Sequence, residues 1–441
     1  MEAPVELTSA PAEQLAYLIR DGEVLAVEVV EAHLERIADV NRALNAVVQV
    51  DSERAVNAAK AADRARADGA ALGPLHGVPF TAKDNFLTAG VVTAVGVRER
   101  AEVVPTEDAT AVARMRAAGA ILLGKTNCPR WGGGGFTDNE LYGRTNNPYD
   151  AGRTPGGSSG GEAAIIAAGA SPCGLGSDSG GSLRQPAHFC GIACIKPTAG
   201  LVPVTGVIDD DGEFGAISDP RTQVGPLART VGDVALVLSV IAGPDRHEPD
   251  VPPVALGDAG EVELRRLRAL VVYQNDLVTP TDETVAAVAA AGAALADAGV
   301  VAEVGALPGG GHELTREIWA SYGGRMSSAD TYRLFRRWDA YRRRMLELLE
   351  PYDLILSPTF DGPAPRHDEV EEERTWDGVS YTTPFSLTGW PAAIVRAGTA
   401  GAVLPLGVQI VARPWQDQVA LAAAACVEAA LGGWRPPAPG R

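Results

Sequence analysis

Cysteine is scarce in this sequence, and its spacing excludes the usual cysteine-based sites. The chain has 441 residues and only five cysteines, Cys128, Cys173, Cys190, Cys194 and Cys426. An odd number spread over a long chain argues against a disulfide framework. The spacing between Cys190 and Cys194 matches neither a redox C-x-x-C pair nor a zinc knuckle. We therefore expect small buried apolar side chains here and no metal site.

Long apolar runs and positive charge are lacking as well. No run of about 18 apolar residues occurs, and the segment up to Gln14 has neither a basic start nor an apolar stretch. We therefore expect a cytoplasmic protein without a membrane span. Lys and Arg total 38 against 56 Asp and Glu, a net charge of -18. Such a surface repels phosphate backbones and anionic lipid, so neither nucleic acid nor a membrane is an expected partner.

Lysine is the rarer of the two basic residues, with only four in the chain. The set consists of Lys60, Lys83, Lys125 and Lys196. A lysine differs from an arginine chemically because burial can lower its pKa far enough to leave a neutral amine. A buried lysine in this chain is therefore a candidate for chemistry that arginine could not perform.

The hydrophobic pattern alternates between helices and short strands, which indicates an α/β fold. Residues 1–70 are predicted to form a helical region that packs on a core of residues 71–441, in one continuous domain. Further helices are expected near 106–118, 162–168, 231–241, 282–298 and 418–431, with strands near 120–123, 267–272 and 404–411. Residues 129–225 are rich in Gly, Ser and Thr, which favours a site built from bare backbone over a plain structural interior.

The segment from Gly119 to Thr126 satisfies the phosphate-loop pattern G-x-x-x-x-G-K-[ST] letter for letter. A working phosphate loop follows a strand and opens a helix, with its middle residues free to direct backbone N–H groups at phosphate. Here a predicted helix precedes the segment and its middle residues are Ala-Ile-Leu-Leu. We therefore reject nucleotide binding.

Ser158 stands at the centre of G-x-S-x-G, the pattern of the nucleophile elbow in α/β-hydrolases. That mechanism needs a histidine base late in the chain. Only His312 and His367 come late enough, and both lie in polar, loop-like sequence without a strand before them. The elbow is therefore the weaker interpretation of Ser158.

Three segments carry residues that are unusual for a scaffold. Lys83 follows an apolar stretch, where a charged amine would be costly, so we expect its amine to be neutral. Residues 155–161 (PGGSSGG) and 176–186 (GSDSGGSLRQP) place Ser158 and Ser182 in glycine-rich loops that a substrate can approach closely. Consecutive N–H groups before Ser182 can converge on one point, as an oxyanion hole requires.

With these segments, the sequence resembles the amidase signature family from about Leu7 to Leu431. Ser158 follows Lys83 by 75 residues and Ser182 follows Ser158 by 24, separations similar to those of the family's lysine, cis-serine and nucleophilic serine. The resemblance implies a single amidase-signature domain, with a mixed, twisted central β-sheet covered on both faces by α-helices. It also implies cleavage of carbon–nitrogen amide bonds without a metal or an organic cofactor.

The same resemblance implies a role for each residue. Ser182 is the expected nucleophile, Ser158 the proton relay held by a cis peptide, and neutral Lys83 the base. Its pKa would have to fall from near 10.4 to about 7–8. The oxyanion hole is expected at the N–H groups of Ser179, Gly180, Gly181 and Ser182. The supporting residues are Ser159, Asp178 and Arg184.

Substrate specificity is the part of the function that the sequence leaves open. Four glycines, Gly132, Gly133, Gly134 and Gly135, stand in the segment that lines the acyl pocket in the family, which predicts a broad cavity for a bulky substrate; a flexible loop is the alternative. The aromatic segment from Gly309 to Tyr341 is either structural cover or part of the substrate lining. The expected partner is a small-molecule amide, ester or carbamate, bound by a monomer or homodimer. A urethanase, the glutaminase subunit of an amidotransferase and a non-catalytic scaffold remain as alternatives.

Overall fold

The computed structural model describes residues 6–209, 212–215, 219–322, 326–370 and 377–438. Its helices are α1 (Ala12–Asp21), α2 (Ala26–Leu44), α3 (Ser52–Ala67), α4 (Thr110–Ala117), α5 (Gly160–Ala167), α6 (Arg184–Cys190), α7 (Val231–Ile241), α8 (Asp282–Asp297), α9 (Gly311–Tyr322), α10 (Ser328–Leu349), α12 (Thr383–Thr388) and α13 (Asp417–Leu431). Its strands are β1 (Val47–Val50), β2 (Pro79–Lys83), β3 (Ile121–Thr126), β4 (Cys173–Asp178), β5 (Ala193–Lys196), β6 (Gln223–Ala228), β7 (Arg268–Val271), β8 (Val301–Val304), β9 (Leu354–Pro358), β10 (Ala392–Ala400) and β11 (Leu404–Ala412).

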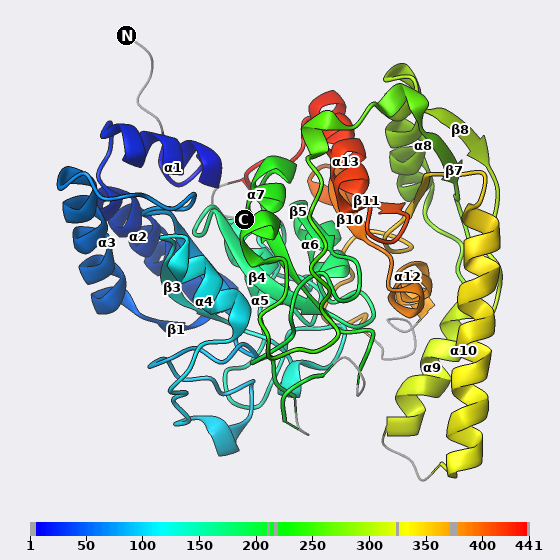
Figure 1. Cartoon of the computed structure of the whole chain (residues 1–441), viewed down its shortest axis with the longest axis horizontal. Coiled ribbons are helices and arrows are strands. Elements are labelled where there is room, and N and C mark those ends of the chain that lie inside the picture. The colour runs from blue at the N-terminus through cyan, green and yellow to red at the C-terminus, as the bar shows by residue number, and fades with distance from the viewer. Residues whose placement is uncertain (1–5, 210–211, 216–218, 323–325, 371–376, 439–441) are drawn as a thin grey trace.

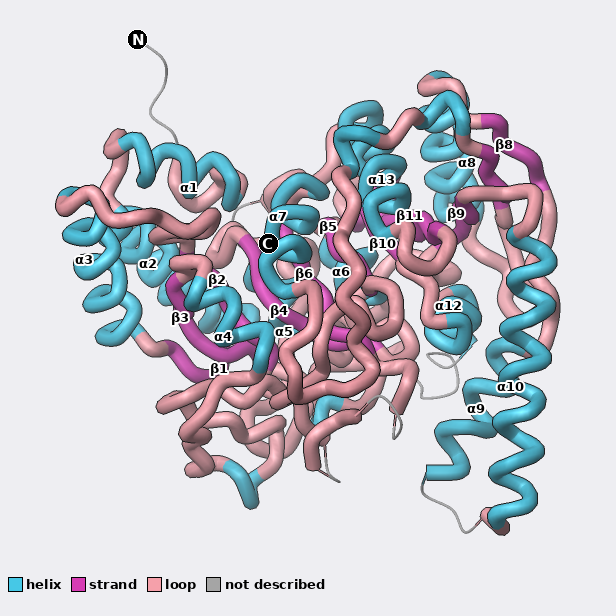
Figure 2. The backbone as a smooth tube through the Cα atoms, viewed as in Figure 1, coloured by secondary structure: helices cyan, strands magenta, loops and turns pink. Residues whose placement is uncertain are grey.

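The strands form one mixed sheet of 11 strands in the order β1-β3-β2-β4-β6-β5-β10-β11-β9-β7-β8. Parallel pairing joins β2 to β3 and β4, and β7 to β8 and β9; the remaining pairs are antiparallel. The sheet twists through the middle of the molecule with helices around it (Figures 1 and 2). The predicted α/β class with a mixed central sheet is confirmed.

Helices cover both faces of this sheet, as neighbouring residues of β11 show. Leu406 is paired with Gly398 of β10, and a Cβ atom on Gly398 would lie 2.8 Å from Ala287 of α8. Gly407, the next residue, approaches the opposite helix, because its Cβ atom would lie 3.1 Å from the Cα of His188 in α6. Adjacent residues in a strand point to opposite faces, so α8 and α6 lie on opposite sides.

The N-terminal helices belong to the same hydrophobic core as the rest of the chain. One buried cluster includes Leu15 of α1 and Val30 of α2, together with Ile166 of α5 and Val234 of α7. This continuity fits the predicted single domain, while the division at residue 70 stays a prediction. No helix within the described residues is both long enough and apolar enough to cross a membrane.

Most predicted elements are confirmed to within one or two residues, but the helix expected near 106–118 begins later, at Thr110. The chain before it is held by other contacts. The N–H of Ala109 donates to the carbonyl of Leu87 at 2.7 Å, and Asp108 accepts from the N–H of Ala89 at 2.7 Å. These contacts fix the residues before Thr110 outside the helix.

The rejected phosphate loop is part of β3. Gly124 and Lys125 pair with both neighbouring strands, and a Cβ atom on Gly124 would collide with the carbonyl oxygen of Gln49. The amine of Lys125 donates to the carbonyl of Phe86 at 2.6 Å and lies 3.6 Å from the carboxylate of Asp84. The glycine therefore allows close strand pairing, and the lysine is held within the interior.

Candidate active site

Lys83 ends β2, the strand that pairs with both β3 and β4. Its side chain is fully buried, and its amine lies 2.6 Å from the Ser158 hydroxyl and 2.9 Å from the Ser177 hydroxyl. Burial lowers the pKa of Lys83 to about 8, although the charges of Cys128 and Asp178 oppose that shift. A buried amine between two hydroxyls can exchange protons with either of them.

Burial alone does not distinguish Lys83 from the other core lysines. Lys196 is also fully buried, and burial together with the nearby Arg184 lowers its pKa to about 7. Its amine, however, donates to the backbone carbonyl of Pro197 at 3.0 Å. Among the lysines that the structure describes, only Lys83 has serine hydroxyls within hydrogen-bonding distance of its amine.

Ser158 lies in the glycine-rich loop that leads into α5. The peptide bond between Gly157 and Ser158 is cis, and Gly156 has a φ of 84°, a conformation that favours glycine. Helix α5 packs closely against the backbone after β3, since a Cβ atom on Gly161 would lie 2.5 Å from the backbone N and O of Asn127. The glycines therefore allow the loop to bring Ser158 down onto Lys83.

Ser182 lies in the turn between β4 and α6, next to the Ser158 loop. The N–H of Ser159 donates to the carbonyl of Ser182 at 3.1 Å, and the Ser159 hydroxyl donates to the carbonyl of Ser177 at 3.3 Å. Ser182 is half-buried. Among the described residues, no hydrogen bond joins the Ser182 hydroxyl to that of Ser158, so the two serines lie in adjacent loops without a hydrogen bond between their side chains.

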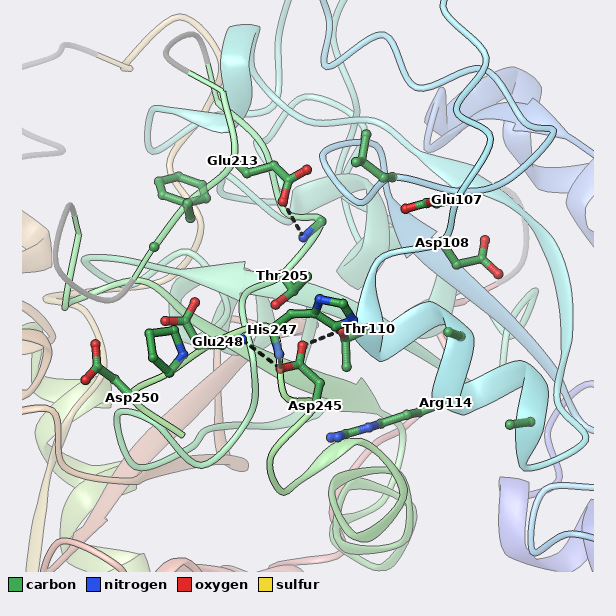
Figure 3. Close-up of a pocket in the computed structure, with 17 residues that line it drawn as sticks. Glu107, Asp108, Thr110, Arg114, Thr205, Glu213, Asp245, His247, Glu248 and Asp250 are labelled. Carbon is green, nitrogen blue, oxygen red and sulfur yellow. Dashed lines mark hydrogen bonds between the residues drawn. The ribbon is translucent and has the colours of Figure 1, made fainter. Parts of the chain in front are cut away.

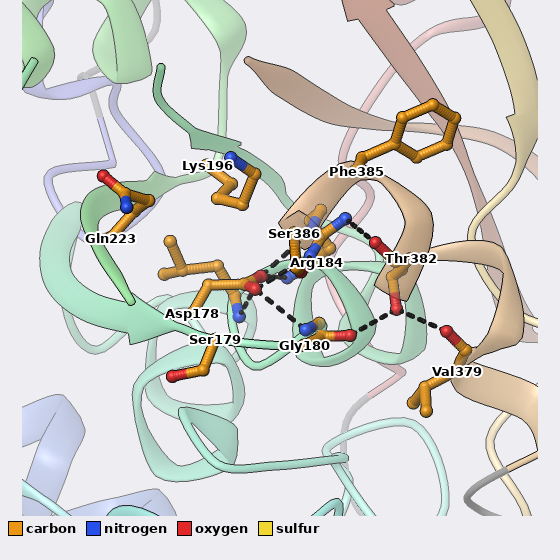
Figure 4. Close-up of polar contacts among 12 residues, drawn as sticks. Asp178, Ser179, Gly180, Arg184, Lys196, Gln223, Val379, Thr382, Phe385 and Ser386 are labelled. Atoms are coloured by element: carbon orange, nitrogen blue, oxygen red, sulfur yellow. Dashed lines mark hydrogen bonds and ion pairs between the residues drawn. The ribbon is translucent and has the colours of Figure 1, made fainter. Parts of the chain in front are cut away.

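Asp178 and Arg184 hold this turn from within the core (Figure 4). Both side chains are completely buried, and the guanidinium contacts both carboxylate oxygens, at 2.8 and 2.9 Å. Burial alone would raise the pKa of Asp178, but the charge and hydrogen bonds of Arg184 outweigh it and hold that pKa below its ordinary value. The carboxylate also accepts the N–H of Leu183 at 3.0 Å.

Gly180 and Gly181 contribute unequally to the predicted set of oxyanion donors. The N–H of Gly181 donates to Asp178 at 2.8 Å and is therefore already engaged. The carbonyl of Gly180 accepts the Thr382 hydroxyl at 2.6 Å, as Figure 4 shows, which fixes the orientation of the loop. In this conformation the remaining predicted donors are the N–H groups of Ser179, Gly180 and Ser182.

The four-glycine segment lies beside the Ser158 loop. A Cβ atom on Gly157 would lie 2.6 Å from the backbone N of Phe136 and 2.8 Å from the carbonyl carbon of Gly135. A Cβ atom on Gly133, in contrast, would meet nothing nearer than 4.0 Å. The predicted lining residues and Ser158 are therefore brought together.

Three residues at the site were not singled out by the sequence. Ser177 contacts the Lys83 amine, Asn85 donates to the Ser177 hydroxyl at 3.1 Å, and Thr382 binds the Gly180 carbonyl. Ser177 directly precedes Asp178 inside a segment already identified, and that position was its only signal. No motif includes Asn85 or Thr382, and only the fold brings Thr382 to the turn that bears Ser182.

The hydrogen bonds found for the two late histidines go to residues other than Ser158 and Ser182. His312 Nδ1 lies 3.2 Å from the Thr383 hydroxyl, and His367 Nε2 lies 3.0 Å from Asn146 Oδ1. Neither hydrogen bond involves the two serines. The structure therefore gives no support to the nucleophile-elbow interpretation.

A separate surface cavity of about 1030 Å³ lies between α4 and the loop after α7 (Figure 3). One acidic residue of its lining, Asp245, has a structural role. Asp245 accepts hydrogen bonds from Thr110 and from the N–H groups of His247 and Glu248, and these bonds hold its pKa well below the ordinary value although burial opposes them. Across the described part of the chain, no three His, Cys, Asp or Glu side chains are placed to hold a metal ion.

Comparison with known proteins identifies the family. The Amidase family model matches residues 28–331 and 318–421. The chain is 34% identical to a glutamyl-tRNA(Gln) amidotransferase subunit of Moorella thermoacetica, over 96% of this chain and 97% of that protein. It is 32% identical to the acylamidase of Rhodococcus erythropolis, over 95% and 94%. The solved structure of 6-aminohexanoate cyclic dimer hydrolase with its substrate superposes with a TM-score of 0.82 at 28% identity, covering 98% of this chain and 99% of that one. The chain therefore belongs to the amidase signature family of amide-hydrolysing enzymes.

Proposed function

We propose that the chain hydrolyses small aryl and alkyl amides through an acyl-enzyme on Ser182. The observation that carries this proposal is the buried 2.6 Å contact between the Lys83 amine and the Ser158 hydroxyl, beside the turn that bears Ser182. A hydroxyl becomes an effective nucleophile when an adjacent base removes its proton. Ser158 then connects the base to the nucleophile.

Lys83 acts as the base in its neutral form. With a pKa of about 8, roughly a tenth of the amine is unprotonated at pH 7. Its lone pair accepts the Ser158 proton, while one of its N–H groups donates to Ser177. Because Asn85 also donates to Ser177, that hydroxyl is occupied as an acceptor and the lone pair of Lys83 is left for Ser158.

Acyl transfer proceeds by two linked proton transfers. The Ser182 oxygen bonds to the substrate carbonyl carbon as its proton passes to Ser158 and the Ser158 proton passes to Lys83. The N–H groups of Ser179, Gly180 and Ser182 stabilise the negative oxygen that forms. The relay then returns a proton to the amide nitrogen, the carbon–nitrogen bond breaks, and water later hydrolyses the ester on Ser182 by the same route.

The acyl group is proposed to lie against the glycine segment from Gly132 to Gly135. Backbone without side chains leaves room beside Ser158, and the open space around Gly133 agrees with a broad pocket. Esters and carbamates would follow the same attack and the same acyl-enzyme, so they belong to the set of substrates to be tried.

A glutaminase subunit of an amidotransferase is the second candidate function. It is favoured by the identity to the Moorella thermoacetica amidotransferase protein over almost the whole of both chains. Such a subunit would hydrolyse glutamine efficiently only with its partner proteins present. Turnover of aryl or alkyl amides by the isolated chain separates the two functions.

Labelling and turnover test the proposal together. A serine-directed fluorophosphonate should add to Ser182, and Ser182→Ala should remove both the adduct and the activity. Lys83→Ala should lower kcat/KM on the order of 10²–10⁴-fold, while the matched control Lys60→Ala, on the exposed side of α3, should leave it unchanged. Near-normal turnover in Lys83→Ala, or loss of turnover in His312→Ala, would overturn the lysine-based relay.

A further inference from the structure

Trp319 of α9 lies against the backbone of the nucleophile loop. A Cβ atom on Gly180 would lie 2.6 Å from Cζ2 of the indole, so the ring edge occupies the space where a side chain at position 180 would be. Gly180 stands two residues before Ser182. An aromatic ring from a distant helix is therefore in direct contact with the loop that carries the nucleophile and the proposed oxyanion donors.

The indole is held in place by its surroundings. The Arg221 guanidinium lies 5.3 Å from the ring centroid, and the buried Arg221 is paired with Asp219 at 3.0 Å. Thr222, the next residue, is hydrogen-bonded to the Ser179 hydroxyl. The same short segment thus contacts both the indole and the nucleophile loop, which makes the ring a fixed wall.

The Trp319 indole and the segment from Gly132 to Gly135 contact two different loops of the site. The glycine segment packs against Gly157, on the Ser158 side, whereas Trp319 packs against Gly180, on the Ser182 side. Trp319 is only partly buried, so some of its apolar surface is left uncovered by the chain. A carbonyl oxygen bound by the N–H groups near Gly180 would bring the rest of its amide close to this surface.

We propose that Trp319 is a specificity-determining residue that packs against an aromatic or other flat apolar group of the amide substrate. The inference rests on the proposed function of Ser182 and extends it to the substrate class. A flat, immobile ring gives contact area without loss of side-chain freedom on binding. A small aliphatic amide, which does not reach the indole, gains nothing from it.

Acetamide, acetanilide and phenylacetamide form a matched test series, because each of the last two adds one phenyl group, on the amine or the acyl side. In Trp319→Ala, kcat/KM for at least one aryl amide should fall about tenfold or more through a higher KM, with acetamide within about twofold. Trp319→Phe should keep most of the aryl preference. Tyr332→Ala, an exposed aromatic residue on the adjoining α10, should change none of the three values.

Binding to the Ser182→Ala protein tests the contact independently of turnover. Adding Trp319→Ala to that protein should weaken calorimetric binding of the preferred aryl amide by the same factor. Equal losses on all three substrates in Trp319→Ala would show that the indole only supports the loop, and unchanged aryl-amide binding would show no contact; either result overturns the inference. Absence of turnover in the wild type, with Trp319-dependent aryl binding intact, would instead overturn the proposed function alone.

Discussion

Replacing Arg184 by methionine removes the most heavily bonded side chain at the site. All five N–H groups of its guanidinium have acceptors: the two oxygens of Asp178, the carbonyl of Thr382 at 2.8 Å, Gln409 Oε1 at 2.9 Å and the Ser386 hydroxyl at 2.8 Å. Figure 4 shows Arg184 among Asp178, Thr382 and Ser386. The change therefore affects α12 and β11 as well as the loop itself.

The expected loss of unfolding free energy is about 6–8 kcal/mol. Removing one partner of a buried ion pair costs about 3–5 kcal/mol, because the remaining charge is left in the interior. Three further acceptors lose their donor, each at about 1 kcal/mol or more. A domain is stabilised by only about 5–15 kcal/mol in total, so Arg184→Met removes a large part of it.

Urea unfolding followed by circular dichroism measures this loss. Arg184→Lys keeps the positive charge but not the planar, multiply donating guanidinium, and should lose less unfolding free energy than Arg184→Met. Adding Asp178→Asn to Arg184→Met should cost less than the two single losses combined, because no unpaired carboxylate remains. The control is Arg333→Met, whose 2.6 Å pair with Asp330 is exposed to solvent and should contribute little to stability. A loss in Arg184→Met no larger than in this control would refute the reasoning.

The pKa values of Lys83 and Glu162 and the open space around Gly133 each have a measurable consequence. Because only the neutral amine of Lys83 accepts a proton, kcat/KM should rise with pH through about 8 and then level off; a profile that is flat from pH 6 to 9 would contradict this base. Burial raises the pKa of Glu162 to about 8, so the folded state keeps a proton that the unfolded state has already lost, and stability should fall between about pH 5 and 8. This fall amounts to at most about 1.4 kcal/mol per pH unit, and Glu162→Gln should remove it. If the unfolding free energies of the two proteins, measured with urea at each pH, changed in parallel with pH, the prediction would be contradicted. Gly133→Leu, at an ordinary φ with open space around it, should impair turnover of bulky anilides more than of acetamide, whereas equal losses would argue against the acyl pocket.

The sequence predicted well wherever local pattern determined structure. Helix α7 coincides with the predicted 231–241, and the first residue of α8 is Asp282 as expected, because a Thr at each N-cap accepts an N–H from the third residue beyond it. Spacing within one motif also located Ser158 and Ser182 in adjacent loops. These features depend on residues near one another in the chain.

Contacts between distant segments were not predictable in the same way. Trp319 meets Gly180 across 139 residues, and no periodicity in either segment indicates that contact. The hydrogen bond from the Gly181 N–H to Asp178 was not predicted either. A run of glycines indicates only that the backbone can adopt many conformations, not which of the N–H groups is hydrogen-bonded. Which of them turns inward depends on the buried carboxylate beneath the loop.

The proposed catalytic residues and the proposed specificity residue come from different parts of the strand order. Lys83 ends β2, Ser158 lies in the loop before α5, and Ser182 follows β4. Both β2 and β4 are interior strands, each paired with neighbours on both sides. Trp319 comes from α9, which follows β8 at the edge of the sheet and precedes α10 in the hairpin seen beside the main body in Figure 1. A substitution in the hairpin can alter the wall at Gly180 without disturbing the pairing that positions the amine. Relatives with the same central strands can therefore share one reaction while acting on different amides, and the residue at position 319 is where such a difference should be looked for first.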